Sequence, residues 1–280
     1  MDKKTFFAVF KTGERISQIE TLCLYALPFL LLSTSYQSFL WTNFLIQLAI
    51  FIPLVQIPAY LTGKMSWVDI GWPVGLTVLG FTGLYLGEGY SLRKWLWSIC
   101  YILHGGRMAL GAILILPKQI MKTELPRYRT AKERWIASGQ LESTFWMKIQ
   151  QETFTQCLAN CFTLSTPLML AVFNKNPSLN VLDYIGLIGW AASYFWENKS
   201  DIQKDNFIRK VSSMKRDVRG DKKMSDEQKL KRQAELDVVV LGYAPFDGPE
   251  HSCWVVSRHP NYFGEWMCWF SFGVGAVGNL

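Results

Sequence analysis

The chain has 280 residues, of which 50% are hydrophobic, 15% aromatic and 18% charged, and its formal net charge is +7. A charged fraction below the ~25% of soluble domains, with apolar residues gathered into long stretches, argues against an ordinary soluble domain. The basic residues lie between the apolar stretches, where they suit anionic lipid or an anionic cofactor. We therefore expect membrane lipids as partners and no nucleic acid, while protein partners stay open.

Uncharged stretches recur along the chain. The first, from Thr21 to Gly63, would form a helix about twice as long as the ~30 Å hydrocarbon core, so it must turn, and we place the turn at the polar run 33–38. Backbone in lipid must satisfy its own hydrogen bonds, which favours helices. The sequence predicts an all-α, polytopic integral membrane bundle of about seven transmembrane helices, near residues 22–37, 41–62, 66–86, 95–117, 153–174, 180–197 and 262–280.

Charge asymmetry predicts the orientation of these spans. Most of the 29 Lys and Arg residues lie in the N-terminal segment and in the long segments 118–152 and 198–261. The positive-inside rule makes these the cytosolic parts of a multi-pass protein, in the endoplasmic reticulum if the source is eukaryotic. Residues 208–237 form a charged cytosolic insertion, in which Ser225 and Gln228 have the spacing of a helix capping box.

The six cysteines are scattered, with no C-x-x-C pair and no zinc spacing. Cys157 and Cys161 share a helix face, and we interpret them as buried apolar thiols. The sequence therefore predicts no metal site.

Ionisable residues lie at membrane depth, where they are costly unless they are paired or face a cavity. They are Asp69, Arg107, Glu197 with Asp201, and Glu265. We expect them to converge on one cavity open to the cytosol. The alternative is that they are interfacial residues at helix ends that pair for structural reasons.

The densest motif runs from Ser257 to Trp266. Pro260 disfavours helix at His259, so we expect a helix to begin just after His259. Arg258 and His259 then lie at the N-terminus of this helix, where backbone N–H groups favour a phosphate. Asn261 and Tyr262 add hydrogen-bonding groups. Gly264 permits the close approach of another helix or of a flat ligand.

This Arg-His-Pro-Asn-Tyr-Phe-Gly-Glu-Trp sequence resembles the signature of steroid 5-alpha-reductase-like membrane proteins, particularly the branch that shares their C-terminal domain. Further segments are similar in the same order: Asp69-Ile70-Gly71-Trp72, Gly106-Arg107, Pro126-Arg127-Tyr128 with Lys132 and Trp135, and Trp196-Glu197 to Asp201, Gln203, Lys204 and Phe207. The resemblance covers roughly residues 65–275.

The resemblance implies a helical bundle that holds NADPH at cytosolic loops and reduces a carbon–carbon double bond in a steroid, sterol or other lipid. The cofactor supplies the hydride, so the protein must clamp phosphates and place an acid near the developing oxyanion. Carried over by position, the cofactor-binding residues are Arg107, Arg127, Tyr128, Glu197, Asp201, Lys204, Arg258, His259 and Asn261. The candidate catalytic residues, which would orient or protonate the substrate, are Asp69, Tyr262 and Glu265.

The resemblance also divides the chain. Residues 1–64 form an N-terminal transmembrane hairpin, and residues 65–280 form a steroid-reductase-like transmembrane domain that carries the insertion 208–237. The family usually continues into a tail with a Lys-Tyr-Gly-type stretch, and because this sequence stops at Leu280 we expect that tail to be lacking.

Two other functions stay open. An isoprenylcysteine-type membrane methyltransferase, which uses S-adenosylmethionine, also has Arg-His-Pro-x-Tyr before a helix with a nearby Glu. A non-catalytic scaffold or lipid-binding relative would hold anionic lipid through its basic segments. Asn261 and the stretch from Glu197 to Phe207 favour the reductase.

Overall fold

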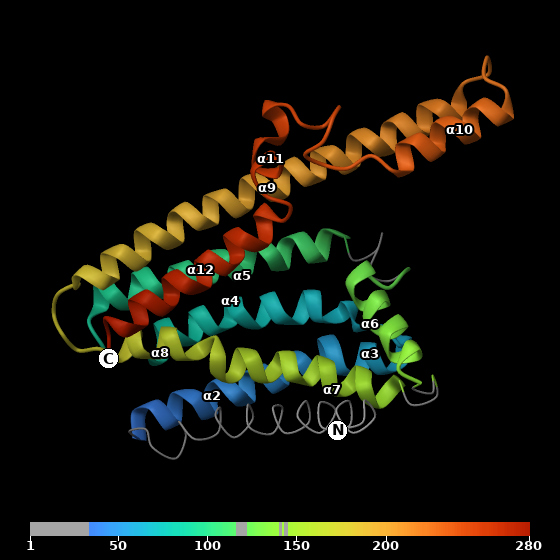
Figure 1. The fold of residues 1–280 in the computed structure, drawn as a ribbon. Helices are drawn as coiled ribbons and strands as arrows, with labels where there is room; N and C mark the ends of the chain where they lie inside the picture. Colours follow the sequence, from blue (N-terminus) through green and yellow to red (C-terminus); the bar gives the residue numbers. More distant parts are fainter. Residues whose placement is uncertain (1–33, 116–121, 140–141, 143–144) are drawn as a thin grey trace, which may run out of the picture. The chain divides into compact units, whose positions relative to one another are not determined.

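The computed structural model describes residues 34–115, 122–139, 142 and 145–280. Every regular element in these residues is a helix, which confirms the all-α class for the described part of the chain. The α-helices are α2 (Thr34–Phe51), α3 (Ile57–Thr62), α4 (Val68–Leu86), α5 (Ser91–Ile115), α6 (Pro126–Ala137), α7 (Phe145–Leu158), α8 (Ser165–Phe173), α9 (Val181–Gly220), α10 (Asp226–Asp237), α11 (Ser252–Val256) and α12 (Pro260–Val277) (Figure 1). The short helical stretches are η1 (Ile52–Gln56), η2 (Met65–Trp67), η5 (Ala159–Thr163) and η6 (Pro249–His251).

The described residues divide into two compact units. Unit 1 comprises those up to Asn180 together with Asn279 and Leu280, and unit 2 runs from Val181 to Gly278. The predicted division at residue 64 follows family resemblance rather than compactness, and it stays a prediction.

Among the described residues, two continuous helices are long and apolar enough to cross a membrane. They are Thr34–Thr62 and Phe145–Phe173, each of 29 residues, and they include the predicted span 41–62 and all but the last residue of the predicted span 153–174. The predicted spans 66–86, 95–117, 180–197 and 262–280 coincide largely with α4, α5, the first half of α9 and α12, which do not meet the same standard of length and apolarity. Residues 22–33 of the first predicted span lie outside the described residues.

The predicted turn at residues 33–38 is wrong where the structure describes it, because residues 34–38 belong to α2. Tyr36 packs edge-on against Phe173 with ring centroids 5.3 Å apart, and this tertiary contact supports helix in a polar run. The helix that contains the predicted span 153–174 begins earlier than predicted, at Phe145, so Lys148 and Glu152 are helical.

Both of these helices contain a π-helical stretch beside a proline. Pro53 lies inside η1, and Pro167 lies one turn after η5, where its ring would crowd the carbonyl of Thr163. Side chains satisfy carbonyl groups within η5: Ser165 Oγ donates to Cys161 O at 2.6 Å, and Asn43 Nδ2 donates to Asn160 O at 3.2 Å.

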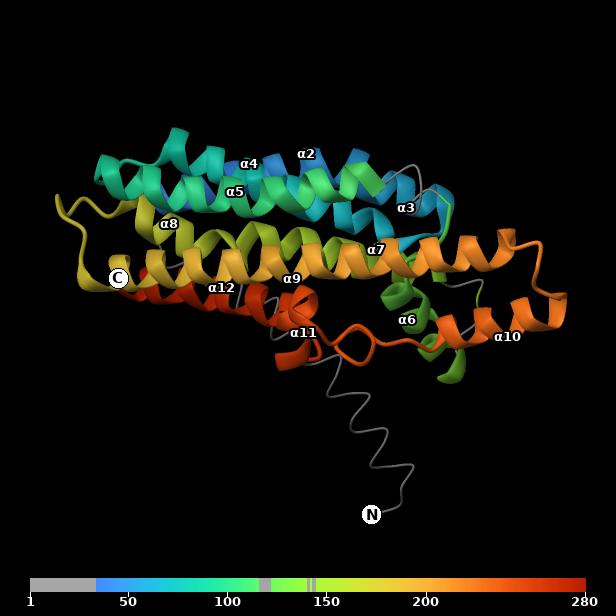
Figure 2. The same ribbon diagram turned by 90° about the horizontal axis from the view of Figure 1, so that it is seen from above.

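Within unit 1, α4 and α5 lie side by side along their length (Figures 1 and 2). Glycine allows this close approach. A Cβ at Gly80 would lie 2.9 Å from the backbone nitrogen of Ile102, and one at Gly105 would lie 2.6 Å from that of Thr77. The preceding segment ends at Gly63, whose φ of 66° closes α3 with a left-handed turn and directs the chain into η2.

Unit 2 is built on α9, a 40-residue helix that continues from the predicted span 180–197 into the charged insertion without a break. Helix α10 folds back along its end, where Lys215 Nζ lies 2.5 Å from Asp237 Oδ1. The predicted capping box is confirmed, since Gln228 N donates to Ser225 Oγ and Ser225 N donates to Gln228 Oε1. Helix α12 packs along the first half of α9.

Candidate functional site

Three of the predicted site residues form one cluster in unit 1. Asp69 lies in the first turn of α4, and Arg127 and Tyr128 lie in the first turn of α6. Tyr128 Oη donates to Asp69 Oδ1 at 2.6 Å, and the guanidinium of Arg127 pairs with the same oxygen. Arg127 Nη2 also donates to Tyr128 Oη at 3.0 Å, and its carbon Cζ lies 4.7 Å from the centroid of the Tyr128 ring. The Pro-Arg-Tyr segment thus folds back onto the start of α4.

The cluster leaves one charge accessible. The Asp69 side chain is 19% exposed, whereas that of Arg127 is 53% exposed, so the Arg127 side chain is accessible to solvent while it pairs with the carboxylate. Burial alone would lower the pKa of Arg127. The neighbouring Asp69 and Tyr128 raise this pKa by more than burial lowers it, so the net shift is upward and the guanidinium stays cationic. Burial and the charge of Asp69 raise the pKa of Tyr128, which keeps its hydroxyl protonated.

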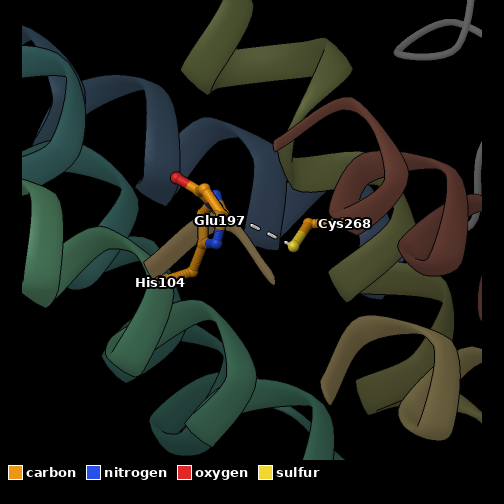
Figure 3. A group of neighbouring side chains, drawn as sticks. All are labelled: His104, Glu197 and Cys268. Atoms are coloured by element: carbon orange, nitrogen blue, oxygen red, sulfur yellow. Dashed lines mark hydrogen bonds between the residues drawn. The ribbon is translucent and has the colours of Figure 1, made fainter. Parts of the chain in front are cut away.

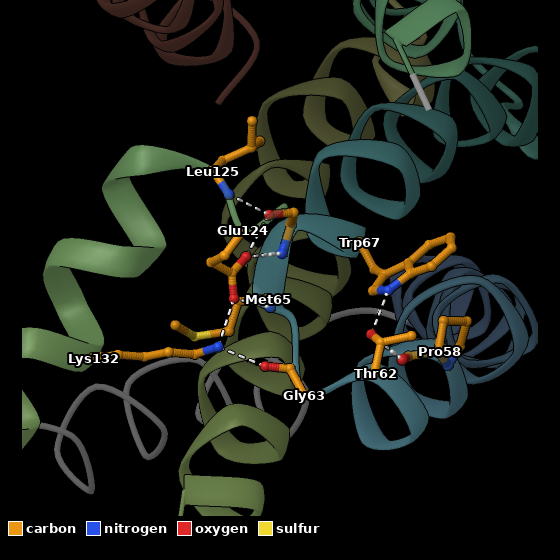
Figure 4. Close-up of polar contacts among 9 residues, drawn as sticks. Pro58, Thr62, Gly63, Met65, Trp67, Glu124, Leu125 and Lys132 are labelled. Atoms are coloured by element: carbon orange, nitrogen blue, oxygen red, sulfur yellow. Dashed lines mark hydrogen bonds and ion pairs between the residues drawn. The ribbon is translucent and has the colours of Figure 1, made fainter. Parts of the chain in front are cut away.

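A second network, around Glu124, fixes this fold-back (Figure 4). Glu124 Oε2 accepts from Met65 N at 3.0 Å and from Lys132 Nζ at 2.7 Å, and Oε1 accepts from Ser66 N at 3.1 Å. Lys132 Nζ also donates to Gly63 O at 2.5 Å, and Leu125 N donates to Ser66 Oγ at 2.9 Å. The chain just before α6 is therefore tied to the chain just before α4.

Glu124 is held as a carboxylate. Burial raises its pKa, but the hydrogen bonds from Lys132, Ser66 and Met65 outweigh burial, so the pKa lies below the ordinary value. Glu124 and Ser66 were not among the predicted site residues. The only available sign was an acidic residue in a basic segment two positions before Pro126.

The second group of predicted residues lies in unit 2, on α9 and at the start of α12. Asn261 Nδ2 donates to Asp201 Oδ1 at 3.1 Å, and Trp196 Nε1 donates to Pro260 O at 3.0 Å. Asn261 Oδ1 is buried and accepts no hydrogen bond from the residues that the structure describes. His259 is non-helical and Pro260 begins α12, as the motif predicted.

Glu197 is buried where α12 meets α9. A Cβ at Gly264 would lie 2.8 Å from Glu197 Cβ and 3.0 Å from its backbone nitrogen, so glycine sets the distance between the two helices. Cys268 Sγ lies 4.0 Å from Glu197 Oε2 (Figure 3). Glu197 therefore belongs to the α9–α12 packing of unit 2.

The remaining predicted site residues lie at the following positions. Arg258, His259 and Tyr262 are exposed, and the rings of His259 and Tyr262 are 5.8 Å apart. No ion-pair partner of Arg258 is found among the described residues. Lys204 and Glu265 are half-buried in unit 2, and Arg107 is half-buried on α5 of unit 1. The predicted site is thus represented by one group of residues in each unit, and their convergence on one cavity stays a prediction.

The fold and these groups define an all-helical protein in which a Pro-Arg-Tyr segment is tied to the start of an apolar helix and an Arg-His-Pro-Asn-Tyr motif opens another. The family model described as "Protein of unknown function (DUF1295)" matches residues 56–280. The chain belongs to this family. Searches of curated proteins and of solved structures found no match.

Proposed function

We propose that the chain is a membrane-bound, NADPH-dependent reductase of the steroid 5-alpha-reductase-like kind, which reduces a carbon–carbon double bond in a steroid, sterol or other lipid. The observation that carries the proposal is the Asp69–Arg127–Tyr128 cluster. Two motifs 58 residues apart were predicted to serve one site, and their side chains are in contact in unit 1.

Exposed apolar side chains support a multi-pass membrane location. Helix α5 has 25 residues and a length of about 37 Å, which exceeds the ~30 Å hydrocarbon core. Large apolar side chains are exposed along this length at helical spacing: Leu92, Trp95, Ile99, Leu103, Leu110 and Leu114. Helix α12 exposes Phe263, Trp266 and Phe270 in the same way. Lipid would cover such stripes, which in water would promote association.

The described residues fit a dinucleotide cofactor. Arg127 presents an accessible guanidinium held by a carboxylate, which suits a phosphate, and Arg258 offers a second exposed cation at the start of an 18-residue helix. The buried Asn261 Oδ1 is an acceptor for a ligand hydroxyl or amide. When bound, NADPH would supply the hydride. In unit 1 the candidate to hold it is Arg127, and in unit 2 the candidates are Arg258, His259 and Asn261, together with Lys204 and Asp201.

The chain's own residues would then handle the proton. Tyr262 and Glu265 lie one turn apart on α12, so both can approach one substrate group, and Asp69 is the third candidate. A protonated donor near the substrate carbonyl would stabilise the oxyanion as the double bond is reduced. Tyr128 and Arg127 would position Asp69, since both donate to its carboxylate.

The test is ligand binding to the full chain in neutral detergent, with NADPH, NADH and S-adenosylmethionine compared. We expect NADPH to bind and Arg127→Ala and Arg258→Ala each to weaken it by about tenfold or more, because each removes charge-assisted hydrogen bonds. Arg129→Ala, on the exposed side of α6, and Arg209→Ala, on the exposed part of α9, are the matched controls.

Other outcomes reject the proposal. Binding of S-adenosylmethionine alone would identify a methyltransferase. Binding of neither ligand would identify a non-catalytic relative. Equal weakening by Arg127→Ala and by Arg129→Ala would show that the Asp69 cluster does not contact the cofactor.

A further inference from the structure

Unit 2 contains a groove of about 740 Å³ that the proposed reaction does not use. It lies between α9 and the turn that contains η6, and its lining includes Phe195, Lys199, Ile202, Asn206, Lys210 and Glu250. Its volume is within the range of small-molecule sites.

The groove is on the side of α9 that faces away from α12. Phe195, Lys199, Ile202 and Asn206 recur at spacings of three and four residues and share one face of the helix. Glu197 contacts α12 at Gly264. Two residues correspond to a rotation of about 200° around a helix, so Lys199 and Glu197 project in nearly opposite directions. The groove is therefore a separate site within unit 2.

The wall opposite α9 is held rigidly. Gln203 joins the two sides, because its Nε2 donates to Ser252 Oγ at 3.2 Å and its Oε1 accepts from Cys253 N at 3.1 Å. His251 is only 4% exposed, and its ring lies 5.7 Å from the ring of Phe246. The wall of the groove is thus formed before any ligand binds.

The lining changes in character along α9. At one end Phe195 is 71% exposed, followed along α9 by Lys199 and then by Ile202, which is 60% exposed. At the other end are Asn206 and Lys210, whose Nζ is 3.9 Å from Glu250 Oε2. Lys199 and Lys210 are 11 positions apart, or about 16 Å along the helix, which suits an elongated ligand. An apolar end beside one cation and a polar end beside another match a molecule with an acyl chain, a phosphate and a polar head.

We propose that this groove binds an anionic glycerophospholipid, with its acyl chain on Phe195, its phosphate at Lys199 and its head group toward Asn206 and Lys210. The proposal rests on the membrane location in the proposed function but not on the reductase activity. Charge decides the class of lipid: two lysines and one carboxylate leave an excess positive charge, which favours an anionic over a zwitterionic lipid.

The experiment uses native mass spectrometry of the full chain in neutral detergent, titrated with phosphatidylglycerol or phosphatidylcholine. We expect phosphatidylglycerol to bind more tightly. Lys199→Gln should weaken phosphatidylglycerol binding about fivefold, the effect of one basic side chain near an anionic lipid. Glu250→Gln should strengthen binding, because it frees Lys210. Lys231→Gln on α10, outside the groove, is the matched control.

Three outcomes would overturn the proposal. They are equal affinity for the two lipids, equal effects of Lys199→Gln and Lys231→Gln, and binding of soluble glycerophosphate as tight as that of the lipid, which would indicate a water-soluble anion instead. NADPH binding is measured on the same preparation. Loss of lipid selectivity with NADPH binding intact rejects the groove site, whereas missing NADPH binding with lipid selectivity intact rejects the reductase.

Discussion

Glu124 shows how one side chain places the candidate site. It receives hydrogen bonds from the backbone of Met65 and Ser66 and from Lys132, and its side chain is 12% exposed. Met65 and Ser66 lead directly into α4 and Asp69, while Glu124 leads directly into Arg127 and Tyr128. The network therefore sets the distance between the two halves of the Asp69–Arg127–Tyr128 cluster.

Glu124→Gln should loosen this connection. The amide keeps the shape of the side chain but loses the charge that pairs with Lys132, at a cost of about 1–3 kcal/mol. Hydrogen exchange of the backbone amides of Met65, Ser66 and Leu125 should accelerate. Glu133→Gln, an exposed position on α6, is the control, and equal acceleration by both variants would contradict the assigned role.

The same network predicts a pH dependence. The pKa of Glu124 is lower in the folded protein, so its contribution to stability is fully present above the unfolded-state pKa and is lost as the pH falls through the folded-state pKa. We expect the difference in exchange between the wild type and Glu124→Gln, corrected for intrinsic rates, to shrink over that acidic range. A difference that stays constant as the carboxylate is protonated would argue against the ionised form as the acceptor.

At the scale of elements, glycine determines how closely α12 approaches α9. Gly264→Ala would place a Cβ within 3.0 Å of the backbone of Glu197, which cannot move aside as the end of a flexible side chain can. We expect a loss of about 1–3 kcal/mol in stability. Gly273→Ala, on the same helix with nothing within 4 Å, should stabilise α12 by up to about 1 kcal/mol. Thermal unfolding in detergent should show shifts of opposite sign.

The capping box at the start of α10 predicts a second local effect. Ser225→Ala removes the acceptor for Gln228 N and should cost about 1 kcal/mol, detectable as faster hydrogen exchange in the first turn of α10. Ser212→Ala, at an exposed position inside α9, removes no cap and should have little effect. Unchanged exchange in the Ser225 variant would mean that the cap does not stabilise the first turn of α10.

At the scale of the whole molecule, the proposed topology can be tested by labelling. Lys222→Cys, between α9 and α10, should react with a membrane-impermeant maleimide in sealed vesicles that expose the cytosolic face, whereas Lys175→Cys, between α8 and α9, should react only after detergent is added. The unsubstituted chain is the control for labelling of its six native cysteines, and the five that lie in the described residues, Cys100, Cys157, Cys161, Cys253 and Cys268, are buried. Labelling of both positions in sealed vesicles would reject the orientation.

Local patterns in the sequence determined much of the outcome. Apolar stretches predicted where helices lie, Pro260 predicted the start of α12, and the spacing of Ser225 and Gln228 predicted a cap, because each depends on neighbouring residues alone. The family resemblance named Asp69 as a candidate catalytic residue and Arg127 and Tyr128 as candidate cofactor-binding residues, and the structure brings these side chains into contact.

Tertiary structure decided the remainder, because contacts between distant segments leave no local pattern. Packing of Tyr36 on Phe173 supports helix where a polar run predicted a turn. The carboxylate of Glu124 gained its importance only when the chain before α4 came beside the chain before α6. The groove beside Lys199 likewise depends on long-range contacts, among them the hydrogen bonds of Gln203 with Ser252 and Cys253. The sequence thus specified the helices and the chemistry of the motifs, while long-range hydrogen bonds and packing specified which of those groups meet.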